Sequence, residues 1–237
     1  MSSSPSALLS ATFYEPGHDH LVELVHQRDG EARRRLASLA VELFDPAGAS
    51  VHRRAVDPNQ EILDLDTVAA PLVGSHGRLM VLFDARYDER IFPYRPHHYA
   101  YLHRRGASAP PLYYAVNAVL GGVPDRIGAT GINNFESYLF SSSFSGRYSV
   151  MLGNVSRFAP ARAQVFSYHG GARSVEEVLL PPKAHREIAL APEREGHRLD
   201  RVEVKALFRL ASYVVGRHAA GGELMLFDHM FAYVKPT

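Results

Sequence analysis

The sequence predicts an all-β protein made of two tandem, pseudo-symmetric antiparallel β-sandwiches with a short helical connector. Short stretches of alternating apolar and polar residues, five to nine residues long, recur along most of the chain. Glycine and proline turn signals separate these stretches, which is the pattern of strands joined by hairpins. The third observation is an internal repeat, which indicates that one unit of structure occurs twice.

The repeat is clearest where an alternating stretch enters a glycine-bearing turn. Positions 124 residues apart correspond in the pairs Val41 and Val165, Val51 and Val175, and Pro58 and Pro182. In both copies a second alternating stretch, a proline and a third stretch follow in the same order, with the third stretches at residues 61–65 and 187–191. This order predicts a strand, a hairpin and two further strands in each copy.

Two further matches extend the repeat toward its ends. Residues 97–102 resemble residues 229–234 at an offset of 132, and residues 21–25 correspond loosely to residues 149–154. Residues 112–120, followed by two glycines, are compatible with a short helix that ends at a glycine. We therefore expect a first sandwich over residues 1–104, a connector with a short helix over residues 105–135, and a second sandwich over residues 136–237.

Composition excludes several classes of function. The chain has 26 Lys and Arg against 25 Asp and Glu, so its net charge of +1 argues against a nucleic-acid partner. It contains no cysteine, which excludes disulfides, thiolate catalysis and cysteine-ligated metals. Apolar runs are shorter than the roughly 18 residues that span a bilayer, and the start lacks the features of a signal peptide. We expect no membrane span and a cytoplasmic location.

The second copy resembles a known family of β-sandwiches. Residues 152–154, the alternating residues 163–168 and the proline-bearing residues 178–188 are similar to the sensory rhodopsin transducer-like family. The resemblance covers residues 145–237 and, more faintly, residues 12–102. It implies single sandwiches that assemble into oligomers and act in signalling or small-ligand binding, with no established reaction. This chain departs from the family because it joins two copies.

The first candidate site is a set of metal ligands. His18 and His20 lie two residues apart in an expected strand, so their side chains project from one face about 6.6 Å apart. Glu23 is a candidate third ligand. Residues 17–23 are similar to the first metal-binding motif of the cupin family, although the spacing from His20 to Glu23 is one residue too short. A polar turn that leads into a strand is the alternative explanation.

The second candidate site is formed by two strands with aromatic and histidine side chains on one face. These side chains are His97, Tyr99, Tyr101 and His103 in the first strand, and His229, Phe231 and Tyr233 in the second. The opposite faces carry mainly small and aliphatic side chains, so we expect those faces to point inward. Either the aromatic side chains close a sandwich, or they form a platform on which a sugar ring or another planar ligand stacks.

Arg95 lies just before the first of these strands, among aromatic residues and prolines. The guanidinium group of an arginine binds carboxylate or phosphate with two parallel hydrogen bonds, which makes a small anion a candidate ligand. A solvated loop whose course is fixed by prolines explains the same residues without a ligand.

These observations favour a non-enzymatic protein that binds a small ligand, a sugar or a small anion, or that serves in signalling or assembly. No cofactor is expected, the partner is a small molecule or a protein, and exposed strand edges predict a homo-oligomer. The alternative is a metal-dependent, cupin-like β enzyme, an isomerase, lyase or oxygenase. It would hold one divalent ion through His18, His20 and Glu23, with a fourth ligand from His97 or His98.

Overall fold

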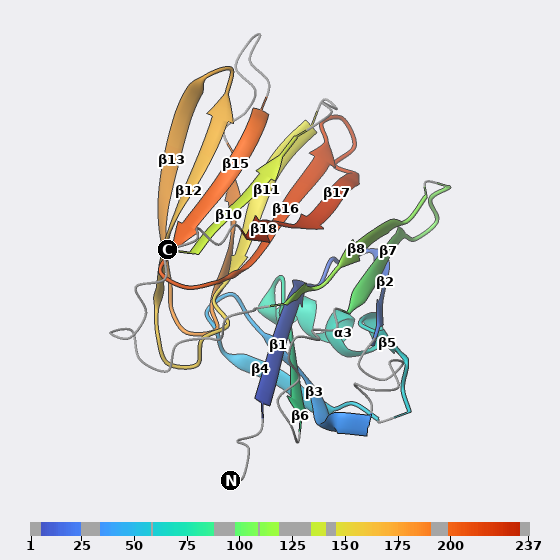
Figure 1. Cartoon of the computed structure of the whole chain (residues 1–237). Coiled ribbons are helices and arrows are strands. Elements are labelled where there is room, and N and C mark those ends of the chain that lie inside the picture. Colours follow the sequence, from blue (N-terminus) through green and yellow to red (C-terminus); the bar gives the residue numbers. More distant parts are fainter. Residues whose placement is uncertain are drawn as a thin grey trace. The chain divides into compact units, whose positions relative to one another are not determined.

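A computed structural model describes residues 6–24, 34–57, 59–87, 98–108, 110–118, 134–140, 146–190 and 199–232. It confirms the all-β prediction, because antiparallel strands form most of the described chain (Figure 1). The chain divides into two compact units, residues 1–122 and residues 123–237, called unit 1 and unit 2 below. The described residues include no helix with the length and apolar character that a bilayer crossing requires.

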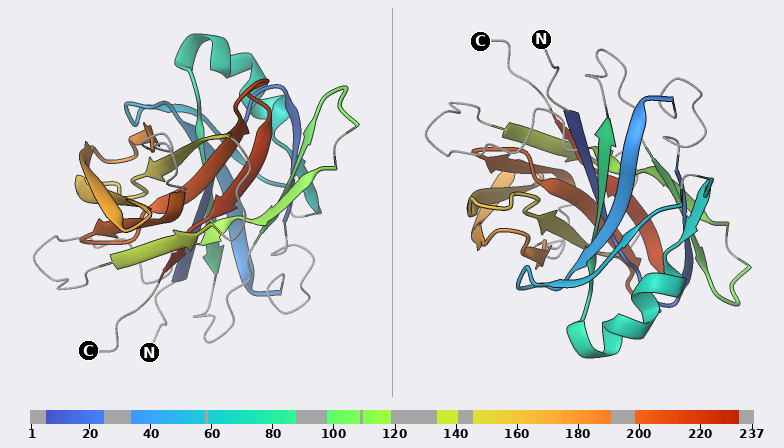
Figure 2. Two further views of the ribbon diagram at one scale, coloured as in Figure 1. Left: turned by 90° about the horizontal axis from the view of Figure 1, so that it is seen from above. Right: turned by 90° about the horizontal axis from the view of Figure 1, so that it is seen from below.

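Unit 1 consists of two antiparallel sheets and one helix. The five-stranded sheet has the order β4-β3-β6-β1-β9, and the four-stranded sheet has the order β5-β2-β7-β8. The elements are β1 (Ser6–Phe13), β2 (His18–Glu23), β3 (Leu36–Phe44), β4 (Ser50–Ala55), β5 (Ile62–Asp64), α3 (Asp66–His76), β6 (Met80–Tyr87), β7 (Tyr99–Arg104), β8 (Leu112–Ala115) and β9 (Asn117–Ala118). Figure 2 shows α3 at the margin of this unit, where it contacts β2 and β4.

Unit 2 also has a five-stranded and a four-stranded antiparallel sheet. Their orders are β13-β12-β15-β10-β18 and β14-β11-β16-β17. The strands are β10 (Asn134–Leu139), β11 (Gly146–Gly153), β12 (Ala161–His169), β13 (Ala172–Leu180), β14 (His185–Ala189), β15 (Leu199–Ala206), β16 (Ala211–His218), β17 (Leu224–His229) and β18 (Phe231–Ala232).

The two units share one strand order. Adding nine to each strand number of unit 1 reproduces both sheets of unit 2. The ladders agree in register as well as in order: Val41 of β3 lies opposite Phe83 of β6, and Val165 of β12 lies opposite Val204 of β15. The backbone N–H groups of Tyr14 and Phe140, each just after β1 or β10, donate to Leu79 and Asp200, so Leu79 corresponds to Asp200 and, four residues later, Phe83 corresponds to Val204. Val41 and Val165 are therefore counterparts, 124 residues apart, as the sequence repeat predicts.

Alternation along the strands places an apolar layer between the two sheets of each unit. In unit 2 the buried core takes side chains from both sheets, among them Val150 and Val214 from one sheet and Val165 and Val204 from the other. In unit 1 the fully buried Val22 and Val41 come from the two different sheets. Burial alternates along β2 and β7, whereas β6 and β16 are buried at consecutive positions.

One local prediction is wrong, and one helix is not predicted by the sequence. The helix expected over residues 112–120 is absent from its described part, because residues 112–118 form β8 and β9 and complete unit 1. Tyr114 and Val116 are buried while Tyr113 is exposed, so burial follows the two-residue period of a strand. Helix α3 was not predicted; it begins after Leu65 and ends at Gly77, whose φ of 73° favours glycine.

Two of the sequence matches are also wrong. The predicted counterpart of the strand at residues 97–102 was residues 229–234, but the counterpart of β7 in the sheet order is β16. The backbone N–H of Val116 donates to His98, and that of Met230 donates to Ser212, so His98 corresponds to Ser212. The match between Val51 and Val175 is out of register too, because the ladder of β3 and β4 contains a shift that the ladder of β12 and β13 lacks. Short aromatic stretches resemble one another without being equivalent in the fold.

Two of the three segments that carry the family resemblance, residues 152–154 and 178–188, meet in a buried hydrogen-bond cluster of unit 2. The Asn154 side-chain amide donates to the carbonyls of Ala159, Leu180 and Pro181 at 2.8–3.0 Å, and its oxygen accepts from the backbone N–H of Ser156 at 2.9 Å. This one side chain thereby ties the end of β11 to the entry of β12 and the end of β13. A structural role explains these residues.

We expect Asn154→Ala to lower the free energy of unfolding by about 2 kcal/mol or more, because the buried carbonyls of Ala159 and Leu180 lose their shared donor. Urea denaturation measures this change. The control is Arg162→Ala at an exposed position of β12, where we expect a change within about 0.5 kcal/mol. Equal losses of unfolding free energy in the two variants would contradict the stabilising role of Asn154.

Candidate functional site

Strand β2 divides the sequence-predicted metal ligands between two faces. His18, His20 and Val22 are buried, while Asp19 is exposed and Glu23 is half-buried. Glu23 lies three positions after His20, and an odd spacing places two side chains on opposite faces of a strand. The structure therefore does not bring the predicted ligand set together on one face.

The described residues contain no group of three or more His, Asp or Glu side chains that could hold a metal ion. His98, a predicted fourth ligand, is buried with its ring 5.0 Å from that of Phe83. His97, the other predicted fourth ligand, lies outside the described residues. The described geometry offers the metal-dependent alternative no support.

His20 instead belongs to a buried hydrogen-bonded chain inside unit 1. Its Nε2 lies 2.9 Å from the hydroxyl of Tyr114, which lies 2.7 Å from the Oγ1 of Thr12. The Nδ1 of His20 is buried and has no hydrogen-bond partner among the described residues. Burial lowers the pKa of His20 to about 3, outweighing the opposite effect of the Asp66 charge, so the ring is neutral at pH 7.

Tyr14 and Asp66 continue this chain toward the surface. The ring of Tyr14 stacks on that of His20 at 6.0 Å, and its hydroxyl donates to Asp66. The other oxygen of Asp66 accepts from the backbone N–H of His20 at 3.2 Å. Helix α3 begins at Asp66, whose own N–H donates to Asp64 at 2.9 Å, so the start of the helix holds this carboxylate in place.

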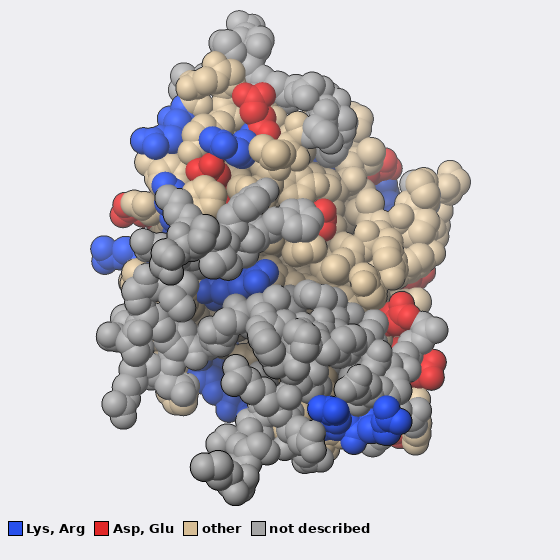
Figure 3. Space-filling model, viewed as in Figure 1, with Lys and Arg blue, Asp and Glu red and all other residues tan. Residues whose placement is uncertain are grey.

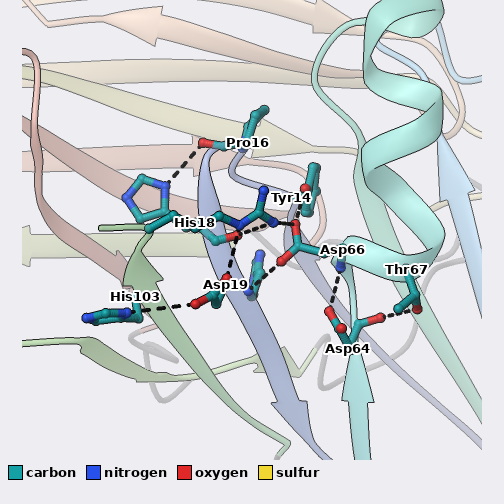
Figure 4. A network of polar contacts seen from close by, with 10 residues as sticks. Tyr14, Pro16, His18, Asp19, Asp64, Asp66, Thr67 and His103 are labelled. Atoms are coloured by element: carbon teal, nitrogen blue, oxygen red, sulfur yellow. Dashed lines mark hydrogen bonds and ion pairs between the residues drawn. The ribbon is translucent and has the colours of Figure 1, made fainter. Parts of the chain in front are cut away.

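Arg105 links Asp66 to the outer face of the four-stranded sheet. Its guanidinium lies 2.7 Å from Asp66 and 3.0 Å from Asp19, and His103 lies 3.8 Å from Asp19 (Figure 4). Burial alone would raise the pKa of Asp66, but hydrogen bonds from Tyr14 and Arg105 lower it below its usual range. Burial and the bond to Asp66 raise the pKa of Tyr14, so its hydroxyl keeps its proton.

We call Thr12, Tyr114, His20, Tyr14, Asp66, Arg105 and Asp19 the polar chain. Sequence reasoning found only His20 of its interior, because its hydrogen bonds and ion pairs join residues 39 to 102 positions apart. Asp66 marks the start of a helix that the sequence does not predict, and Tyr114 lies in a strand where the sequence predicts a helix. Recognising the acidic pair Asp64 and Asp66 as a helix start was the one available signal.

Unit 2 has aromatic rings at two corresponding positions. The backbone N–H of Leu65 donates to His20, as that of Leu190 donates to Tyr148, so His20 corresponds to Tyr148. By the same comparison Tyr14 corresponds to Phe140, because each follows the strand that pairs with β6 or β15. The rings of Phe140 and Tyr148 meet edge to face at 5.0 Å. The two units therefore differ in chemistry at the positions of Tyr14 and His20.

The second predicted site is partly assembled on the outer face of the four-stranded sheet of unit 1. Tyr99, Tyr101 and His103 lie on this face of β7, while Ala100 and Leu102 are buried, as the alternation predicts. The exposure of both tyrosines excludes the alternative in which they close a sandwich. Arg95 and His97 lie outside the described residues.

Tyr113 of β8, which sequence reasoning missed, joins them. It lies opposite Tyr101 in the ladder, and its ring stacks on that of Tyr99 at 5.5 Å with an interplanar angle of 8°. Tyr99, Tyr101 and Tyr113 are 37%, 39% and 62% exposed. We call these three residues the tyrosine face.

The predicted residues of the second copy do not mirror this face. His229 ends β17, half-buried, with its Nδ1 3.3 Å from Asp228. Phe231 lies in the two-residue strand β18, and Tyr233 lies outside the described residues. These positions belong to strands that correspond to β8 and β9, so they are not the counterparts of Tyr99 and Tyr101.

Comparisons with known proteins add no family to this description. No protein-family model matches the chain, and no curated protein matches it.

We predict that His20 makes folding stability depend on pH. Its folded pKa of about 3 lies below the ordinary 6.5, so between these values the unfolded chain binds a proton that the folded chain does not. Stability from this group is complete above pH 6.5 and is lost as the pH falls toward 3. We expect His20→Phe to reduce the slope of unfolding free energy against pH by up to about 1.4 kcal/mol per pH unit.

Urea denaturation between pH 6.5 and 4.5 measures this slope. His76→Gln, a variant in the last turn of α3, serves as the control and is expected to keep the wild-type slope. A His20→Phe slope equal to that of wild type would show that His20 is not held neutral by burial.

Proposed function

We propose that this protein binds a saccharide, without chemical turnover, on the outer face of the four-stranded sheet of unit 1. The observation that carries the proposal is the tyrosine face: three exposed tyrosines from adjacent strands on one side of one sheet. Aromatic rings in such an array offer flat apolar surface to the apolar face of a sugar ring, while their hydroxyls offer hydrogen bonds.

Rigid support favours a binding role for this face. The tyrosines stand on β7 and β8, and β7 also pairs with β2, so their backbones are held by ladder hydrogen bonds. Stacking fixes Tyr99 against Tyr113 before any ligand arrives. Aromatic side chains that are ordered in advance lose little conformational freedom on binding.

Polar groups adjoin the tyrosine face on the side of β2. Glu23 lies opposite Tyr99 and Leu21 lies opposite Tyr101 in the ladder, while Asp64 of β5 lies opposite Leu21. Carboxylates beside aromatic rings accept hydrogen bonds from sugar hydroxyls. The polar chain ends on the same face at Asp19, which lies 3.8 Å from His103.

The charges on this face favour a neutral or amino sugar over a small anion. The guanidinium of Arg105 on this face already pairs with the carboxylates of Asp19 and Asp66. In Figure 3 the visible surface over β7 and β8 is mostly free of charged side chains. An anion would therefore depend on Arg95, which the structure does not describe.

We expect Tyr101→Ala and Tyr113→Ala each to weaken saccharide binding at least tenfold, because each removes a stacking surface. A printed array of neutral, amino and acidic saccharides identifies the probe, and isothermal titration of the full chain measures its affinity. Phe158→Ala, which removes an exposed aromatic ring of unit 2, is the matched control and is expected to leave the affinity unchanged.

Three results would contradict the proposal. They are the absence of binding to every saccharide on the array, affinity unchanged by both tyrosine variants, and conversion of the bound saccharide to product. Selective binding of acidic saccharides that is lost in Arg95→Ala would favour the small-anion alternative instead.

A further inference from the structure

Strand β13 is an unprotected edge of unit 2. It ends the five-stranded sheet and pairs, among the described strands, with β12 alone (Figure 1). It is nine residues long and exposed over residues 172–177, and Val175 and Leu179 are 54% and 61% exposed. Such an edge presents backbone N–H and C=O groups to any further strand.

The corresponding edge of unit 1 differs in ways that discourage pairing. β4 is six residues long and its ladder with β3 has a register shift. Adjacent like charges occur in both edges, as Arg53 and Arg54 in β4 and as Glu176 and Glu177 in β13. β13 pairs with β12 over nine consecutive positions without a shift. Short length, bulges and charged side chains usually protect an edge strand from pairing with another strand. β13 is nine residues long and has no bulge in its ladder with β12.

The charges of β13 are self-complementary. Arg173, Val175 and Glu177 alternate along one face of the strand. If a second β13 lies antiparallel with Val175 opposite Val175, Arg173 faces Glu177 twice. A shift of the centre to Glu176 would place Glu176 opposite its own copy and Arg173 opposite Leu179, which is less favourable.

Neighbouring side chains hold these charges on the outer face of the sheet. The guanidinium of Arg173 lies 5.3 Å from the ring of Phe166, and Gln164 donates to Glu177 at 2.7 Å. Both charged side chains are therefore positioned before a second copy arrives. Figure 3 shows positive and negative side chains interspersed over β12 and β13.

We propose that the occupant of this edge is a second copy of the same chain, and that the two β13 strands pair antiparallel about Val175. The pairing joins two five-stranded sheets into one continuous sheet with two-fold symmetry. It specifies the surface of the homo-oligomer that the sequence predicts, and it does not depend on the saccharide proposal, since β13 belongs to unit 2.

The test is sedimentation velocity of the full chain across a concentration series. Wild type is expected to be a dimer at micromolar concentration. Val175→Lys places two ammonium groups opposite each other, and Arg173→Glu places Glu opposite Glu at both outer pairs. We expect each variant to be at least tenfold weaker in dimerisation, with a circular dichroism spectrum and melting temperature close to those of wild type.

Charge exchange tests the register. Glu177→Arg alone is also expected to weaken the dimer, because it places Arg opposite Arg. An equimolar mixture of the Arg173→Glu chain and the Glu177→Arg chain restores opposite charges at both outer pairs, so we expect a heterodimer near the wild-type affinity. Arg162→Glu is the control, because Arg162 lies on β12 and is expected to leave dimerisation unchanged.

A monomeric wild type at high micromolar concentration would overturn the proposal. So would a dimer that survives both Val175→Lys and Arg173→Glu, or the failure of the mixed single variants to associate.

Discussion

The alternation of side chains along paired strands is the constraint on which the rest of this structure depends. In each unit two antiparallel sheets enclose an apolar layer, so every strand residue has either an inner or an outer position. The same rule that buries Val22, Ala100 and Leu102 in unit 1 leaves Tyr99 and Tyr101 on the outside. It also separates Glu23 from His18 and His20, and so prevents the predicted metal-ligand set. The same alternation therefore explains the buried core, the exposed tyrosine face and the separation of Glu23 from the two histidines.

One framework occurs twice, and the chemistry lies where its two versions differ. The identical strand orders and the equivalence of Val41 and Val165 support the duplication that the sequence predicts. Unit 2 fills one position with the rings of Phe140 and Tyr148, whereas unit 1 has Tyr14 and His20 there and extends them through Asp66 and Arg105 to the outer face. Among the described residues, a helix follows β5 and precedes β6 in unit 1, whereas none lies between the corresponding strands β14 and β15 of unit 2. That helix, α3, supplies Asp66. A local insertion thus accompanies a change from an apolar contact to a polar chain.

The sequence predicted the features that depend on local alternation and missed those that depend on distant contacts. The all-β class, the repeat at Val41 and Val165 and the outward position of Tyr99 and Tyr101 follow from a period of two, which is visible within a few residues. The strands at residues 112–118 were missed because a short apolar run before two glycines also fits a helix. The polar chain was missed because its members are distant in sequence, and the match of residues 229–234 to β7 failed because it rested on similar composition without ladder register.

The proposed ligand surface is the outer face of the four-stranded sheet of unit 1. Hydrogen–deuterium exchange of the full chain, with and without a saturating concentration of the tightest-binding array saccharide, is the decisive measurement, since exchange locates the contact without altering a residue. We predict slower exchange in peptides covering β7 and β8, residues 99–115, with the β12–β13 hairpin unchanged. Protection confined to unit 2, or no protection of residues 99–115 at saturation, would contradict it.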